Sequence, residues 1–131
     1  MEVLKQLSVF LKNEPGVLAR LCQDFKDNQI NILALSVSDT VDHAVLRLVV
    51  SDPLKALHLL EEHGVLVVET EVLGLRAVHK PGVLGEIANR LALAKVNIEY
   101  AYGTAGAEKE KGLIIVRVDN LESAKSALKE F

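Results

Sequence analysis

The sequence predicts an α+β fold in which a βαββαβ unit occurs twice, with antiparallel sheets and the helices on one face of each sheet. The first observation is a repeated motif, because residues 15–18 (Pro-Gly-Val-Leu) recur as residues 81–84, at an offset of 66. The second is that residues 30–32 (Ile-Asn-Ile) are matched by residues 96–98 (Val-Asn-Ile) at the same offset. Motifs that recur at one fixed offset indicate an internal duplication.

Composition agrees with an ordinary globular protein. The chain has 131 residues, is 50% hydrophobic and 25% charged, and carries a net charge of −3. A slightly acidic chain has no general attraction for nucleic acid or anionic lipid. No signal peptide or membrane-spanning apolar run is present, so we expect a cytoplasmic protein. The single cysteine, Cys22, forms no internal disulfide and is expected to be buried.

The first repeat follows from the periodicity of its apolar residues. Alternation predicts strands at residues 4–12, 30–38, 43–50 and 65–72. A stripe at i, i+3, i+4 and i+7 predicts a helix after the first strand, formed by Leu18, Leu21, Cys22 and Phe25. A second helix begins with Asp52 as the N-cap and Pro53 at the first helical position, and ends at residues 63–64 (His-Gly).

The second repeat restarts the same pattern. Leu84, Ile87, Ala88 and Leu91 repeat the helical stripe, and residues 113–118 form the third strand. Residues 119–121 match residues 52–54 at an offset of 67, which makes the second hairpin one residue longer, and its tip at residues 106–112 should be solvated. We therefore predict one repeat over 1–71 and another over 72–131. The last strand of the second repeat is missing, so it has been trimmed or is supplied from elsewhere.

The Pro-Gly pairs open the first helix of each repeat. We expect Pro15 and Pro81 at the first helical position, where a missing N–H costs nothing. Gly16 and Gly82 lack a Cβ, so a ligand carboxylate could approach the free amides of the first turn. The alternative is that the two turns only start helices.

With these motifs, each repeat resembles the ACT domain, a small-molecule-sensing module of ferredoxin-like βαββαβ fold. The resemblance rests on residues 13–21 (Asn-Glu-Pro-Gly-Val-Leu-Ala-Arg-Leu) with 30–32, and on residues 79–87 (His-Lys-Pro-Gly-Val-Leu-Gly-Glu-Ile) with 96–98. The two repeats together account for nearly the whole chain, which leaves no room for an enzyme domain. The chain thus looks like a stand-alone tandem ACT protein.

The resemblance implies a free amino acid bound at an interface between ACT units, by the loop before the first helix and by the start of the second strand. The residues so implied are Asn13, Pro15, Gly16, Val17, Leu18, Asn31, Ile32, His79, Pro81, Gly82, Val83, Leu84, Asn97 and Ile98. The family commonly has Asp two residues before the proline, whereas this sequence has Asn13 and His79, which carry no carboxylate.

The two repeated asparagines lie between apolar neighbours, where strands disfavour Asn. The amide of Asn31 or Asn97 could bond an amino acid's ammonium or carboxylate. The alternative is that each side chain only satisfies the turn between helix and strand.

The first hypothesis is a regulatory homodimer that senses an amino acid or a related small molecule and acts on an enzyme of amino-acid metabolism. The alternative is a protein-interaction or assembly subunit whose ACT folds have lost the ligand, which an open edge beside the missing strand would favour. Tyr100 and Tyr102 share a strand face, but without a basic groove they do not indicate RNA binding.

We find no catalytic constellation, phosphate loop or dinucleotide fingerprint, and the histidines lack the i, i+4 spacing of a metal site. No enzyme activity, cofactor, metal, membrane or nucleic-acid partner is expected.

Overall fold

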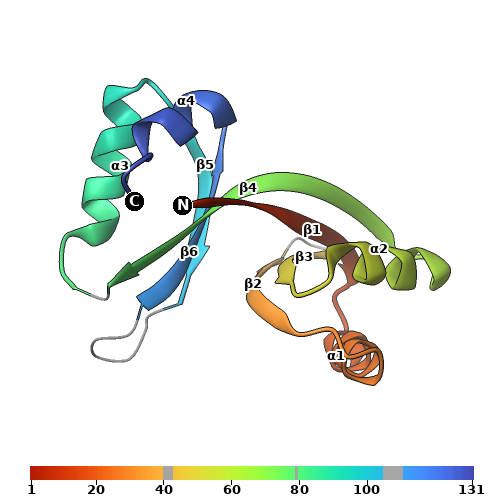
Figure 1. Cartoon of the computed structure of the whole chain (residues 1–131). Coiled ribbons are helices and arrows are strands. Elements are labelled where there is room, and N and C mark those ends of the chain that lie inside the picture. Colours follow the sequence, from red (N-terminus) through yellow and green to blue (C-terminus); the bar gives the residue numbers. More distant parts are fainter. Residues whose placement is uncertain (40–42, 79, 105–110) are drawn as a thin grey trace. The chain divides into compact units, whose positions relative to one another are not determined.

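The computed structural model describes residues 1–39, 43–78, 80–104 and 111–131. The chain forms two compact units: the first unit is Lys5–Thr70, and the second unit combines Met1–Leu4 with Glu71–Phe131. The alternation of strands and helices confirms the predicted α+β class (Figure 1). In chain order the elements are β1 (Glu2–Lys12), α1 (Val17–Asp27), β2 (Ile32–Asp39), β3 (His43–Val50), α2 (Pro53–Glu62), β4 (Leu66–Val78), α3 (Val83–Leu93), β5 (Ile98–Gly103), β6 (Lys111–Val118) and α4 (Leu121–Ala127).

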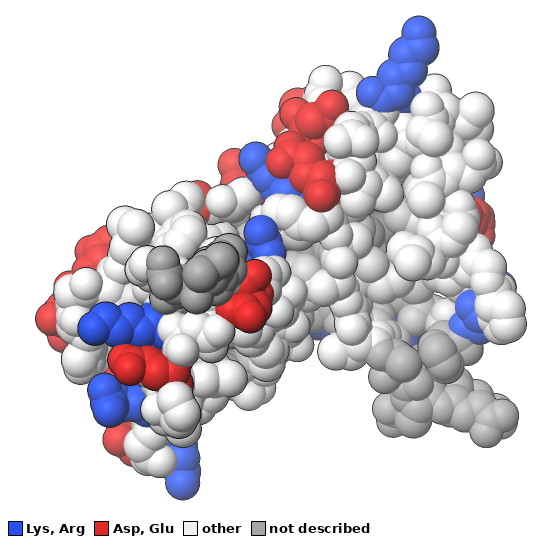
Figure 2. Space-filling view, turned by 180° about the vertical axis from the view of Figure 1, so that it is seen from behind, with Lys and Arg blue, Asp and Glu red and all other residues white. Residues whose placement is uncertain are grey.

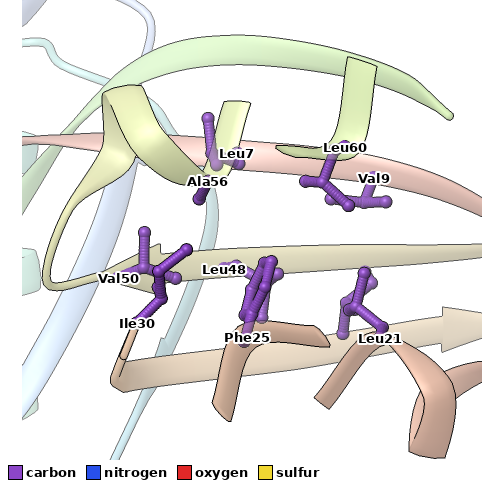
Figure 3. Close-up of a cluster of buried hydrophobic side chains, with 10 residues drawn as sticks. Leu7, Val9, Leu21, Phe25, Ile30, Leu48, Val50, Ala56 and Leu60 are labelled. Carbon is purple, nitrogen blue, oxygen red and sulfur yellow. The ribbon is translucent and has the colours of Figure 1, made fainter. Parts of the chain in front are cut away.

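In the first unit the strand order is β2-β3-β1-β4, and β3 pairs antiparallel with both β1 and β2. Directly opposed residues of an antiparallel pair point to the same face. Leu7 of β1 is opposite Leu48 of β3, and this face meets apolar side chains of both helices. Figure 3 shows that arrangement, with Leu21 and Phe25 of α1 and Ala56 and Leu60 of α2 turned toward the strand residues.

The second unit repeats this packing with β1-β4-β6-β5. Leu73 of β4 is opposite Val116 of β6, and both are fully buried. Helices α3 and α4 lie on one side of these strands (Figure 1). Ile87 and Leu91 of α3 and Leu128 at the end of α4 close the core. Each unit therefore has its own apolar core between one sheet face and two helices.

The last strand of the second unit comes from the start of the chain. Residues Glu2–Leu4 of β1 belong to this compact unit, and β1 is the sheet neighbour of β4. The contact is close, since a Cβ added to Gly74 would stand 2.5 Å from Cδ1 of Leu4. The strand predicted at residues 65–72 continues without a break to Val78, so that β4 is longer than predicted. Because β1 and β4 are both long, each contributes to both units.

Three local predictions are wrong. Pro15 and Pro81 do not occupy the first helical position, because α1 begins at Val17 and α3 at Val83, with Gly16 and Gly82 as their N-caps. The stripe of α1 is narrower than predicted, since only Leu21 and Phe25 are buried, and Cys22 is exposed. By contrast, α2 begins as predicted, with Asp52 as N-cap and Pro53 inside the first turn.

The second hairpin is longer than predicted. The backbone of Asn31 exchanges hydrogen bonds with Ser51, and that of Asn97 does the same with Asp119. The side-chain N-caps of α2 and α4 are Asp52 and Asn120. Both comparisons give an offset of 68 rather than 67, so the hairpin gains two residues relative to the first repeat. Its tip lies largely in residues 105–110, outside the described residues.

Candidate functional site

The first Pro-Gly pair forms a type II β-turn. Gly16 has φ 87° and ψ −12°, and the N–H of Val17 donates to the carbonyl of Glu14 at 3.4 Å. A type II turn places proline first and requires positive φ at the second central residue, where glycine meets no steric penalty. The pair is therefore explained by the turn that precedes the helix, not by the first helical position.

The second Pro-Gly pair has nearly the same backbone. Gly82 has φ 92° and ψ −11° and is the N-cap of α3. The first helical hydrogen bonds correspond as well, from Arg20 N–H to the Gly16 carbonyl at 3.0 Å and from Glu86 N–H to the Gly82 carbonyl at 2.9 Å. His79 lies outside the described residues.

The helices that follow these turns lack side-chain caps. No side chain accepts a hydrogen bond from the first turn of α1 or α3. In α2 and α4 the caps are present, from Lys55 N–H to Asp52 and from Ser123 N–H to Asn120, both at 3.1 Å. Uncapped first-turn amides together with the positive end of the helix dipole favour a carboxylate. Among the described residues this contrast separates the Pro-Gly helices from the other two.

A carboxylate lies beside the first turn, in a place that the sequence analysis missed. The side-chain amide of Asn13 donates to Oδ1 of Asp39 at 2.6 Å. Asp39 ends β2, opposite Ala44 of β3, and the neighbouring β1 residue opposite Ala44 is Leu11. Asn13 lacks the family's acid, yet an acid reaches the same turn from another strand. The available signal was topological, because β1 and β2 of this unit type are parallel and end at the same edge.

In each unit, the predicted turn residues lie mostly at the surface. Among them, Val17 and Val83 are half-buried, and Val83 packs against the core of the second unit, whereas the other described ones are exposed. Leu18 and Leu84 are unusually open for leucines, at 43% and 56% exposure. The exposed members are Asn13, Pro15, Gly16, Leu18, Pro81, Gly82 and Leu84.

The structure does not bring the strand residues to the turn of the same unit. Lys12, just before the first turn, is opposite His43, whereas Ile32 is opposite Val50 at the other end of β3. Those ends are separated by about 23 Å, at about 3.3 Å per residue of strand. Asn31, with Ile32, therefore lies far from Gly16, and Asn97, with Ile98, lies far from Gly82 by the same argument. Asn31 and Asn97 precede their strands rather than lying within them.

The second turn borders a pocket of about 270 Å³. Its walls come from the end of β4, the first turn of α3, the residue after β5 and the start of β6. The lining is mostly apolar or small, and Lys80 is its charged member. The lining residues are Ala77, Val78, Lys80, Gly82, Val83, Leu84, Gly85, Thr104, Gly112 and Ile114.

Other chemistry has little support in the described part of the chain. There, no group of three or more His, Cys, Asp or Glu side chains is arranged to hold a metal ion. Tyr100 and Tyr102 stack on one another with ring centroids 6.5 Å apart. Acidic and basic side chains are interspersed on the face shown in Figure 2. No described helix has both the length and the apolar character needed to cross a bilayer.

Comparison with known proteins gives a consistent result. A family model described as an ACT domain pair matches residues 1–130. Protein BT0572 from Bacteroides thetaiotaomicron is 34% identical, with a TM-score of 0.91 over 98% of this chain and 88% of that one. The ligand-free regulatory subunit of aspartate kinase from Thermus thermophilus is 17% identical, with a TM-score of 0.70 over 98% and 94% of the two chains. The Thermus flavus regulatory subunit has a TM-score of 0.62 at 16% identity, over 99% and 92%. A search of curated proteins finds no match.

Proposed function

Since the chain belongs to the family of ACT domain pairs, we propose that it is a regulatory protein that binds a free amino acid at an interface between ACT units. The regulated partner would be an enzyme of amino-acid metabolism. Two proteins of similar fold are regulatory subunits of aspartate kinase, which supports this class of partner.

The observation that carries the proposal is that the first Pro-Gly turn has one group suited to a negative charge and another suited to a positive charge. The uncapped amides at the start of α1 suit a carboxylate. The Asp39 carboxylate, 2.6 Å from the Asn13 amide, suits an ammonium. A carboxylate offers about four acceptor positions, so its bond to Asn13 leaves capacity for a ligand. Together they match the two ends of a zwitterionic amino acid.

The separation between turn and strand residues supports a site at an interface. Gly16 and Asn31 lie at opposite ends of one unit, so a ligand of amino-acid size cannot touch both. A second copy of the chain could bring its Asn31 and Ile32 to the first copy's turn. We therefore propose that the site is completed in a homodimer, which ties ligand affinity to assembly.

The test is a calorimetric screen of the twenty amino acids, with native mass spectrometry of the free and bound protein. Asp39→Asn should weaken binding of the best amino acid by about tenfold or more, because a charge-assisted hydrogen bond is lost. Asp27→Asn is the matched control, since Asp27 is an exposed carboxylate at the far end of α1. No binder at millimolar concentration, or equal losses in the two variants, would contradict the proposal.

The assembly-subunit alternative loses its main support. It rested on an open edge beside a missing strand. Residues Glu2–Leu4 occupy the position next to β4 in the second unit, so that edge is covered by the chain itself.

A further inference from the structure

A second pocket of the second unit is bordered by a concentration of positive charge. It has a volume of about 330 Å³ and lies beside the end of β4 and the first turns of α3. Four of its lining residues are basic and two are acidic. The charged members are Arg76, Lys80, Glu86, Arg90, Lys111 and Glu130.

Among the described residues, three of the four basic side chains at this pocket have no ion-pair partner. Arg90 pairs with Glu86 at 3.2 Å and lies 4.7 Å from the centre of the Phe131 ring. Within the described residues, Arg76, Lys80 and Lys111 have no carboxylate oxygen within 4 Å. Glu130 is the remaining acid of the pocket. Among the described side chains that line the pocket, three cations and one carboxylate therefore have no ion-pair partner.

The first repeat shows that this charge is not needed by the fold. Offsets of 66 in β4 and α3, and of 68 in β6, place Phe10, Glu14 and His43 at the equivalent positions. These three residues line an equivalent depression of the first unit, of about 750 Å³, whose own basic residues are Lys12 and Arg20 at other positions. One backbone thus carries three cations in the second unit, and an acid, a phenyl ring and an imidazole in the first.

An apolar space adjoins the basic pocket. The 270 Å³ pocket at the second Pro-Gly turn shares Ala77, Val78, Lys80 and Val83 with it. Its remaining walls include Leu84 and Ile114. A ligand with its charge at Lys80 could therefore extend an apolar group into that space.

We propose that the second unit binds a small organic dianion, a phosphate monoester or a dicarboxylate, through Arg76, Lys80 and Lys111, with the apolar part of the molecule in the adjoining pocket. Two negative charges match the excess of cations, and arginine offers a planar fork to carboxylate or phosphate oxygens. The proposal goes beyond amino-acid sensing, because an amino acid with a neutral side chain carries one carboxylate. It stands or falls separately from the first-turn site.

The experiment is a calorimetric titration of the full chain with phenyl phosphate and with phthalate. Binding of either probe supports the proposal, and the better probe identifies the head group. Lys80→Gln combined with Lys111→Gln should weaken that binding by about tenfold or more. Lys26→Gln combined with Lys55→Gln is the control, because it removes the same charge from exposed positions on α1 and α2 of the first unit.

Two results would overturn the proposal. One is no binding of either probe at millimolar concentration. The other is an equal loss of binding in both double variants. Each double variant is more negative by two charges, so an equal loss would reflect the net charge of the protein rather than a specific site. Asp39→Asn should leave probe binding unchanged. Loss of amino-acid binding in that variant is therefore distinguishable from failure of the dianion pocket.

Discussion

The two Pro-Gly turns have the same backbone and different surroundings. Gly16 and Gly82 agree within a few degrees in φ and ψ, and both precede helices without side-chain caps. Around the first turn stand Glu14 and Asp39, whereas the second has Lys80 next to its proline. Only glycine tolerates the positive φ without strain, so the turn is constrained, while the neighbouring side chains are free to differ. Similar backbones here carry an acid before the first proline, Glu14, and a base before the second, Lys80.

The pocket of about 270 Å³ at the second turn has small side chains in its walls. Three of its walls are smaller than the equivalent residues of the first unit, at the offsets of 66 and 68 given by the strand registers. The second unit has Ala77, Gly85 and Gly112, and the first has Leu11, Ala19 and Ala44. The first unit also has a depression beside its turn, of about 750 Å³ and lined by Leu11, so the two hollows differ in their walls rather than in being present or absent.

The largest expected effects come from cavities made in the two cores, and they test whether the two units behave alike. Phe25→Ala in the first core should cost about 3–5 kcal/mol, and Leu91→Ala in the second about 2–5 kcal/mol, since each leaves a cavity among buried side chains. Because β1 and β4 belong to both units, we expect each variant to shift a single common transition in urea, followed by circular dichroism.

The control is Leu93→Ala, because this leucine of α3 is 78% exposed and should change stability little. Two separate transitions, of which each core variant shifts only one, would show that the units unfold independently despite the shared strands.

The origin of the last strand distinguishes the units and is tested at Gly74. Gly74→Ala should destabilise the chain by about 1–3 kcal/mol, because the new Cβ would stand 2.5 Å from Leu4 Cδ1. Leu4→Ala removes the clashing atoms, so the double variant should be more stable than the two single effects predict. Additive losses in urea unfolding would mean that Leu4 does not lie against β4.

Much of the fold could be predicted because its causes are local and repeated. Alternation located the strands, and the Asp52-Pro53 pair located the start of α2. The exposure of Cys22 was missed because a helical stripe does not say how far the sheet beneath it extends. The source of the last strand could not be found from the periodicity, because it depends on pairing between residues about seventy positions apart, such as Leu4 and Gly74.

The candidate site was predictable as a motif but not as a geometry. The Pro-Gly turns were found in the sequence, although their type II conformation was not, because the helix boundary was placed before the glycine instead of after it. Asp39 and Lys111 were missed for one reason. Each lies on another strand, at the end of β2 or the start of β6, and the pairing of that strand places it near the turn. Spacing along one segment does not reveal such neighbours.

The smallest predicted effect addresses whether the two turns are equivalent as backbones. Gly16→Ala and Gly82→Ala should each cost about 1–2 kcal/mol, because an L-residue is strained at φ near +90° even though nothing lies within 4 Å of the added Cβ. Gly85→Ala is the matched control: it also meets open space, but it lies inside α3 without positive φ, and should stabilise by about 0.5–1 kcal/mol. Thermal unfolding of the three variants measures these changes in stability directly. The losses of stability in Gly16→Ala and Gly82→Ala should be similar. If they differ by more than the stability gained in Gly85→Ala, the two turns do not share one conformation in solution. Equal losses would assign every functional difference between the turns to the side chains around them.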